Sequence, residues 1–157
     1  MRTLLILLTL LNPGLAHALS CLRPDAVRMF EQARQSKAAF YLVRGEVMFL
    51  EAPNVPARGA KTPTTTRAQI SGSALTSAGF QAPFQRDVMI ETSCLGPWCG
   101  DLDGLVGDLI MAIEITGPDT LVLNVGPCGG DAIPWDTSGE ERLMACFLEG
   151  TCVTADF

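Results

Sequence analysis

Residues 41–49 read YLVRGEVMF, and this stretch decides the fold class of the chain. Its apolar side chains recur at every second position, and a period of two predicts a strand with one buried face. Gly45 lies at the centre of the alternation, where a glycine favours a bulge or a sharp bend. Because the strands of small barrels need such bends, the stretch favours a small barrel.

Four further stretches have the composition of strands, namely residues 67–75, 86–93, 108–116 and 120–125. The intervening segment from Glu51 to Thr66 contains three prolines, a glycine and a run of threonines. This composition excludes regular ladder pairing and predicts a long exposed loop. The sequence therefore predicts five strands.

A helix is expected on either side of these strands. Asp25 is a suitable N-cap for the first, a helix of roughly three turns. Its stripe would consist of Ala26, Phe30, Ala33 and Lys37. Ser138 and Glu141 have the spacing of a capping box, and Gly150 marks the end of the second helix. Its apolar stripe would consist of Met144, Phe147 and Leu148.

These elements predict a mainly β domain. The expected architecture is a small five-stranded OB-like Greek-key barrel with an N-terminal and a C-terminal helix, stabilised by disulfides. A compact sandwich is the alternative, but so few strands would leave two separate sheets with many open edges. The barrel is therefore preferred.

The first residues have the order of an export signal. Arg2 supplies the positive start, residues 4–11 supply a short apolar core, and Pro13 and Gly14 end it. A membrane-spanning helix needs ~20 apolar residues, which this segment does not offer. We expect a signal peptide over residues 1–18, a single domain over 19–157, and a location in the periplasm or outside the cell.

Two cleavage positions fit the rule for small residues before the cut. Cleavage after Ala18 is preferred, because alanine then occupies both required positions. Cleavage after Ser20, with a signal peptide of residues 1–20, would make Cys21 the amino-terminal residue. Lipidation of Cys21 is a third possibility, although Leu19 and Ser20 match poorly the small residues that usually precede a lipoprotein cysteine.

The charge of the chain limits its partners. The leader contains one basic and no acidic residue, so its removal changes the formal net charge from -6 to -7. An acidic surface repels phosphate backbones and anionic lipid. We therefore expect neither nucleic-acid binding nor a membrane span.

All six cysteines follow the predicted leader, which indicates an oxidised, disulfide-stabilised exported domain. Cys146 with Cys152 is the safest pair, because a helix end at Gly150 would fold Cys152 back towards Cys146. The other four cysteines can join in three ways. We favour Cys21 with Cys128 and Cys94 with Cys99, and the alternatives remain open. In the chain-entropy model the long bridge would contribute about 5 kcal/mol and each short one about 2 kcal/mol.

A family resemblance rests on short motifs around these cysteines. They are Cys21, Phe30, VRGEV at 43–47, CLGPWCG at 94–100 and GPCG at 126–129. Together they resemble the netrin-like and tissue inhibitor of metalloproteinases (TIMP-like) group. More narrowly, CLRPD at 21–25 with GPWCG at 96–100 looks like small uncharacterised exported proteins of alphaproteobacteria.

The resemblance implies an OB-like barrel whose amino-terminal segment is held by disulfides. In the inhibitors, the amino group and carbonyl of a first cysteine chelate the catalytic zinc of a bound protease. Only Cys21 matches that position in this sequence. The family's Cys-x-Cys start is absent, and the preferred cleavage leaves Leu19 and Ser20 ahead of Cys21.

The only histidine, His17, lies in the predicted leader, so the mature chain can form no Ser-His-Asp or Cys-His arrangement. We therefore expect no enzyme and no cofactor. A carboxylate-dependent hydrolase is an alternative and would draw on Glu91, Asp101, Asp103, Glu114 or Asp131. A cleft without two such carboxyls within ~10 Å of each other would exclude it.

We also expect no metal site. Asp101, Asp103 and Asp108 could offer oxygen ligands to calcium, but the spacing lacks the twelve-residue loop with a closing glutamate. A zinc site made of cysteines would remove the disulfides. The C-x4-C spacing of Cys94 and Cys99 differs from the C-x2-C of redox pairs and favours a structural disulfide.

These observations favour an exported module that binds a protein or peptide partner. The expected contact residues are Cys21, Leu22, Arg23, Pro97 and Trp98. Trp98 and Trp135 could form an aromatic patch, or could instead cap an open end of the barrel. Metalloprotease inhibition through the Cys21 segment is the first alternative function, and the hydrolase is the second.

The exported protein should have an intact mass that corresponds to residues 19–157 without lipid. The mass should lie about 6 Da below that of the reduced chain, because each disulfide removes two hydrogens. Mass spectrometry before and after reduction measures both quantities. A mass that corresponds to residues 21–157 would instead show that Cys21 is the first residue, as the inhibitor mechanism requires.

Overall fold

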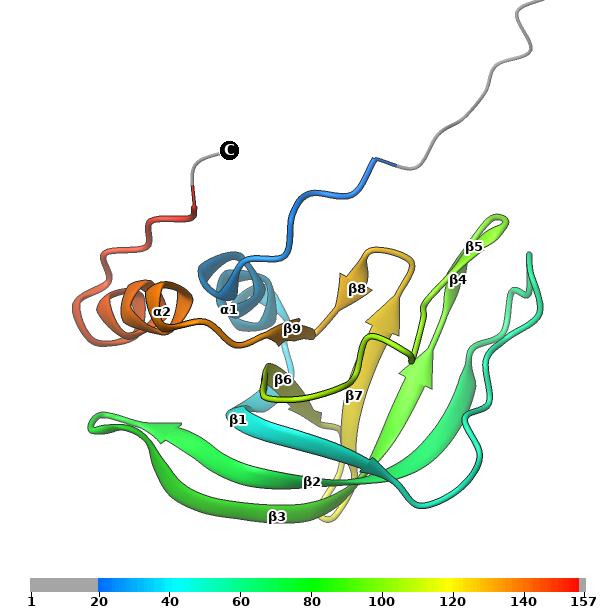
Figure 1. Ribbon diagram of the computed structural model, residues 1–157, viewed down its shortest axis with the longest axis horizontal. Coiled ribbons are helices and arrows are strands. Elements are labelled where there is room, and N and C mark those ends of the chain that lie inside the picture. Colours follow the sequence, from blue (N-terminus) through cyan, green and yellow to red (C-terminus); the bar gives the residue numbers. More distant parts are fainter. Residues whose placement is uncertain (1–19, 156–157) are drawn as a thin grey trace, which may run out of the picture.

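The computed structural model describes residues 20–155, so the predicted leader and the preferred cleavage position lie outside the described residues. Two helices and nine strands make the described chain mainly β (Figure 1). The elements are α1 (Ala26–Gln35), β1 (Ala39–Phe49), β2 (Thr64–Thr76), β3 (Gly79–Thr92), β4 (Cys94–Leu95), β5 (Trp98–Cys99), β6 (Leu109–Ile115), β7 (Leu121–Gly126), β8 (Gly129–Gly130), β9 (Ala132–Pro134) and α2 (Thr137–Glu149).

The five long strands β1, β2, β3, β6 and β7 overlap the stretches where the sequence predicts strands, but β3 begins at Gly79, well before the predicted start at Arg86. The predicted number of five is nevertheless inexact, because β4, β5, β8 and β9 are additional. These four strands have two or three residues each, too few to show an alternating pattern. The predicted loop also ends earlier than expected. Thr64 to Thr66 pair with β3. These threonines follow Pro63, and β-branched residues favour strands.

Each of the five long strands pairs with two others of the five. β1 pairs with β2 and β6, and β2 forms a long antiparallel hairpin with β3. β3 then runs parallel to β7 over residues 89–92, and β7 pairs with β6. The short strands β8 and β9 extend β7 and β6.

β1 changes its partner around Gly45. Its residues 39–45 pair with β6, and its residues 43–49 pair with β2. Gly45 lies opposite Gly72 of β2. A Cβ atom at Gly45 would overlap the carbonyl oxygen of Ser71, and one at Gly72 would overlap the carbonyl oxygen of Arg44. The close pairing of β1 with β2 therefore leaves no space for a side chain at either glycine, while the register runs through Gly45 without the bulge that the sequence allowed.

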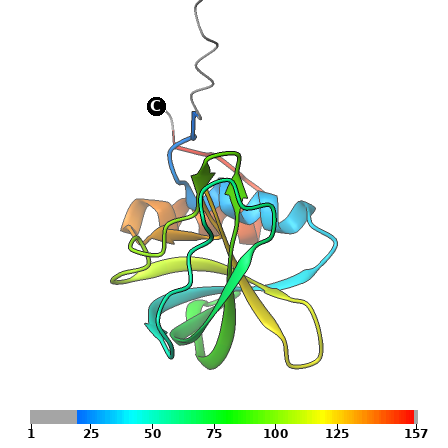
Figure 2. The same cartoon turned by 90° about the vertical axis from the view of Figure 1, so that its right-hand side faces the viewer.

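The apolar residues form two clusters. One lies between the long strands and contains Val43, Ile70 and Ile90. The other lies between the strands and the two helices, which cover the same side of the strands (Figures 1 and 2). β6 contributes to both clusters, because alternate residues of a strand point to opposite faces. Leu109, Met111 and Ile113 join the first cluster, and Ile110 and Ala112 join the second.

The two helices match the sequence unequally. α1 begins after the predicted N-cap Asp25, whose carboxylate accepts a hydrogen bond from the Arg28 backbone N–H, but it ends at Gln35, so the expected stripe is wrong at Lys37. α2 ends before Gly150 as predicted, but its N-cap is Asp136 and the expected capping box at Ser138 is wrong. The buried side of α2 consists of Gly139, Leu143 and Cys146. The expected stripe is also wrong, since Phe147 and Leu148 are exposed.

The stripe of α2 was assigned wrongly because the helix carries apolar residues on more than one face. Leu143 and Cys146 lie three residues apart and face the core, while Met144 and Leu148 lie four residues apart and face outwards. Either pair has a spacing that fits an amphipathic helix. Only the packing of α2 in the cluster that it shares with α1 decides which face is buried.

Gly45→Ala should lower the free energy of unfolding by about 3 kcal/mol or more, because backbone atoms of β2 would have to move. Gly104→Ala is the matched control, since nothing lies within 4 Å of a Cβ atom at Gly104. Urea unfolding followed by circular dichroism measures both variants. Equal stability of the two variants would contradict the close approach of β1 and β2.

Candidate binding site at the disulfide-pinned end

A disulfide fixes the segment that precedes α1. Cys21 is bonded to Cys128, which follows β7, across a sequence separation of 107 residues. Residues 20–25 have no regular secondary structure, and this bond joins their start to the end of β7. The disulfides Cys94–Cys99 and Cys146–Cys152 are also present. All three pairs are those favoured from the sequence.

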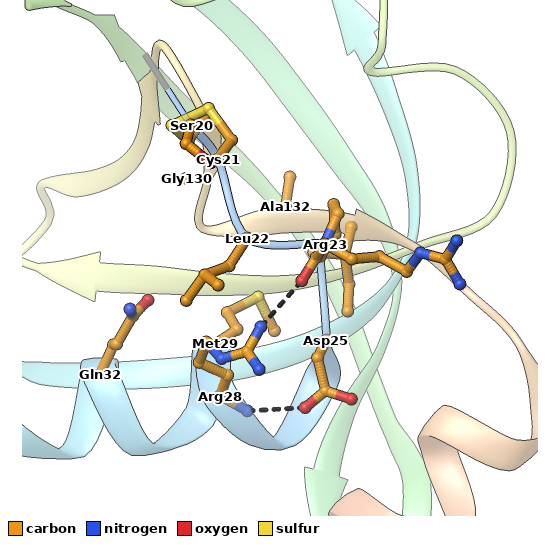
Figure 3. A pocket seen from close by; sticks show the side chains of 13 residues that line it. Ser20, Cys21, Leu22, Arg23, Asp25, Arg28, Met29, Gln32, Gly130 and Ala132 are labelled. Carbon is orange, nitrogen blue, oxygen red and sulfur yellow. Dashed lines mark hydrogen bonds between the residues drawn. A yellow bond between two sulfur atoms is a disulfide. The ribbon is translucent and has the colours of Figure 1, made fainter. Parts of the chain in front are cut away.

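A hollow of about 340 Å³ lies beside this segment (Figure 3). Its walls come from residues 20–25, from α1 and from the chain around Cys128. The Leu22 side chain is 66% exposed and points towards α1, whereas the Arg23 side chain points away (Figure 3). The Arg28 guanidinium donates a hydrogen bond to the Arg23 carbonyl oxygen at 2.9 Å. This contact connects the segment to the first turn of α1.

A second hollow, of about 520 Å³, lies beside the β4–β5 hairpin. The hairpin pairs Cys94 with Cys99 and Leu95 with Trp98, so its disulfide joins directly opposite residues. Pro97 and Trp98 line the hollow, and the Trp98 side chain is 38% exposed. The opposite wall comes from the loop that contains Val55 and Pro56.

The base of this hairpin is held closely against the strands. The Gly100 backbone N–H donates to the Ser93 carbonyl at 2.9 Å. A Cβ atom at Gly100 would overlap the carbonyl oxygen of Val125. The sulfur atoms of Cys94 and Cys99 lie 3.7 and 3.8 Å from the carbonyl oxygen of Ala57, in the loop before β2. These contacts fix the direction in which Pro97 and Trp98 are presented.

The two hollows adjoin at the turn after β7. Cys128 lines the first hollow, and its neighbour Pro127 lines the second. Cys21, Leu22 and Arg23 therefore lie on one side of this turn, and Pro97 and Trp98 lie on the other. We call these two hollows and their walls the pinned end.

The pinned end is also connected to α2 through Asp25, whose side chain is 1% exposed. Its carboxylate accepts hydrogen bonds from the backbone N–H groups of Arg28 and Ala155, at 3.0 and 3.1 Å, and pairs with Arg142 of α2 at 3.1 Å. Burial alone would raise the pKa of Asp25. The two backbone hydrogen bonds and the Arg142 guanidinium outweigh it and lower this pKa below its ordinary value.

Two of the carboxylates considered for hydrolysis lie close together. The Asn124 side-chain amide of β7 donates to Glu114 of β6 and to Asp131, at 3.2 Å in each case. The two acceptor oxygens are therefore separated by no more than twice that distance. The pKa of Asp131 is raised, mainly because burial disfavours its charged form. The hydrogen bond from Asn124 lowers this pKa, and the charge of the neighbouring Glu114 raises it. Asn124 was not singled out in the sequence, because polar residues in strands are usually solvated.

The cavity at this carboxylate pair has a volume of only about 170 Å³. Small-molecule sites usually measure roughly 300–1,000 Å³. Gln32 lines both this cavity and the first hollow of the pinned end, so the two adjoin along α1. Glu114 and Asp131 thus lie close enough to each other for carboxylate catalysis. The cavity beside them is small for a substrate.

The remaining candidate carboxylates do not converge. Asp101 accepts a hydrogen bond from the Asp103 backbone N–H at 2.9 Å, a turn that is closed within the loop. Asp108 instead pairs with Arg44 at 2.8 Å. Within residues 20–155, no three side chains of histidine, cysteine, aspartate or glutamate are grouped to hold a metal ion.

A cluster around Arg44 has no signal in the sequence. Its guanidinium pairs with Asp108 and, at 3.0 Å, with Glu140 of α2, and it stacks on Trp135 at 3.7 Å from the ring centre. The Trp135 indole N–H donates to Glu140 at 2.5 Å. The hydrogen bond with Asp108 is the main cause of a raised pKa of Arg44. Trp135 therefore packs beneath α2 and is not among the residues that line the hollow with Trp98.

No protein-family model, curated protein or solved structure matches this chain. Neither described helix is long and apolar enough to cross a membrane. The three disulfides are compatible with a periplasmic or extracellular protein.

Asp25→Asn should keep the N-cap, since asparagine caps as well as aspartate, but should remove the charge that faces Arg142. At pH 7 the free energy of unfolding should fall by about 1–3 kcal/mol. The folded state lowers the pKa of Asp25 below its ordinary value of 3.8. The stability that the Asp25 charge contributes is therefore fully present above pH 3.8 and is lost as the pH falls through the folded-state pKa.

The wild type and Asp25→Asn should therefore converge in stability at acid pH, as measured by urea unfolding between pH 2 and pH 7. Asp119→Asn, at an exposed turn position, is the control and should behave as the wild type throughout. A difference between wild type and Asp25→Asn that persists unchanged at pH 2 would contradict the assignment.

Proposed function

We propose that this chain is an exported protein-binding module whose pinned end contacts a protein or peptide partner. In this proposal, residues 1–18 are a signal peptide and the five long strands form an OB-like barrel that carries the site. One observation supports the site most directly. Two disulfides hold Leu22 and Trp98, both exposed, on either side of one turn.

Exposed apolar side chains on rigid supports are typical of binding surfaces. A partner gains most from aromatic anchors whose position is already fixed, because less conformational freedom is lost on binding. Trp98 is fixed by a disulfide-closed hairpin, and Leu22 lies next to a disulfide cysteine. Val55 and Leu95 add further exposed apolar area near Trp98 and Pro97.

Metalloprotease inhibition is the second candidate, and the exposed position of Cys21 favours it. Cys21 and Leu22 are both exposed, and the disulfide to Cys128 holds them beside a hollow. The mechanism needs the amino group of Cys21, which only cleavage after Ser20 would free. The intact mass of the exported protein thus distinguishes the two candidates.

Carboxylate-dependent hydrolysis is a third candidate, supported by the pair Glu114 and Asp131. The amide of Asn124 already binds both carboxylates, and the cavity is smaller than common substrate sites. The pair is therefore better suited to holding β6, β7 and the chain before β9 together. Hydrolysis remains the weaker proposal for this reason.

Leu22→Ala and Trp98→Ala should each weaken partner binding, and Trp98→Ala should do so by about 30-fold or more if it is an anchor. Immobilised oxidised protein would be used to capture partners from the exported fraction of the producing cells, with quantitative mass spectrometry of each variant. Met48→Ala is the matched control, since Met48 is an apolar residue on β1 with 55% exposure. Unchanged capture by the double variant Leu22→Ala/Trp98→Ala would contradict this placement of the site.

A further inference from the structure

The outward side of α2 presents apolar residues that are exposed or half-buried. Met144, Ala145 and Leu148 lie along it, and the Leu148 side chain is 52% exposed. Together with Glu140, Glu141 and Glu149 they line a hollow of about 480 Å³. We call this surface the outer α2 face. Phe147 does not belong to it, because its ring contacts that of Phe30 in α1.

The charges that α2 itself places around this face are negative. Glu141 and Glu149 are exposed at its margin, and Glu140 adds a third carboxylate that is shared with Arg44. The only basic residue of α2, Arg142, is paired with the buried Asp25. The apolar residues are therefore bordered by carboxylates and by no cation of the same helix.

Glu149 is unfavourable for the helix itself. The last turn of a helix carries the negative end of its dipole, where an acidic residue costs about 0.3–1 kcal/mol. α2 has no basic residue in that turn, so nothing on the helix offsets the charge. Local rules of this kind are broken mainly where a residue serves another purpose, and a cation from a partner would meet both Glu149 and the helix end.

We propose that the outer α2 face binds a cationic amphipathic helix of a protein partner. The apolar side of such a helix would cover Met144 and Leu148, and its lysines or arginines would pair with Glu141 and Glu149. A second copy of this chain fits poorly, because two outer α2 faces would bring like charges together. An anionic membrane is repelled for the same reason.

This surface is separate from the pinned end. α2 lies at one end of the long axis and the β4–β5 hairpin at the other (Figure 1). The proposal does not depend on the proposed function of the pinned end. Different variants test the two surfaces, so one proposal can fail while the other holds.

The test uses a synthetic 18-residue helix of leucine and lysine as probe, with leucines on one face, and a matched peptide in which glutamate replaces lysine. Binding to the oxidised full-length mature protein is measured by isothermal titration calorimetry. The lysine peptide should bind and the glutamate peptide should not. Met144→Ser/Leu148→Ser should weaken the affinity by about tenfold or more, because the leucines lose their buried contacts.

Glu141→Gln/Glu149→Gln should weaken binding of the lysine peptide by about fivefold or more through loss of the charge pairs. Glu46→Gln/Asp119→Asn makes the same change in net charge at exposed positions elsewhere and should bind as the wild type does, within about twofold. On addition of the lysine peptide, amide chemical shifts should change most along α2. The dispersion of the amide signals in the same spectra shows whether each variant is folded.

Three results would overturn the proposal. The first is no binding of the lysine peptide. The second is an equal loss of affinity in Glu141→Gln/Glu149→Gln and in the charge control, which would show that the peptide senses only net charge. The third is a wild-type dimer in sedimentation equilibrium that Met144→Ser/Leu148→Ser converts to a monomer, which would show that a second copy covers this face.

Discussion

The fold depends on the close approach of Gly45 and Gly72. Neither position has room for a Cβ atom, so β1 and β2 cross more closely than two strands with side chains could. This crossing lets one half of β1 pair with β2 while the other half pairs with β6. Leu42 and its neighbour Val43 point to opposite faces of β1, as successive residues of a strand do, and so reach the cluster under the helices and the cluster between the strands. The strand that supplies both cores therefore runs through a contact that leaves no room for a side chain at either glycine.

Arg44 connects this crossing to the helices. It precedes Gly45, and its guanidinium meets Asp108 before β6, Trp135 after β9 and Glu140 of α2. Arginine suits this position, because its planar group stacks on an aromatic ring while donating hydrogen bonds at its edge. The position of α2 over the strands is thus coupled to the bend of β1. Arg142, two residues after Glu140, extends the coupling to Asp25 and the segment that Cys21 holds.

Local patterns predicted the long strands, α1 and the disulfide pairs, and they failed where the answer depended on packing. Alternation over five or more residues identifies a strand from its own side chains, as in residues 41–49. The two-residue strands and the buried side of α2 have no such signature. The grouping of Asp108, Trp135 and Glu140 around Arg44 follows from the register of β1 with β6, which single residues do not encode. The candidate site was located through its cysteines, because a disulfide places distant segments together whatever their local structure.

Covalent pinning matters more for binding than for catalysis at this end of the molecule. Residues 20–25 form neither helix nor strand, and a free segment of this kind would lose much conformational entropy when a partner ordered it. The Cys21–Cys128 disulfide removes part of that loss before any partner arrives. A catalytic carboxylate pair would instead need open access to a substrate. One oxygen of Glu114 and one of Asp131 already accept hydrogen bonds from the Asn124 amide, which leaves fewer oxygens for a substrate to reach. The carboxylate pair is therefore already engaged in joining β6 to β7, whereas the segment held by Cys21 stays exposed.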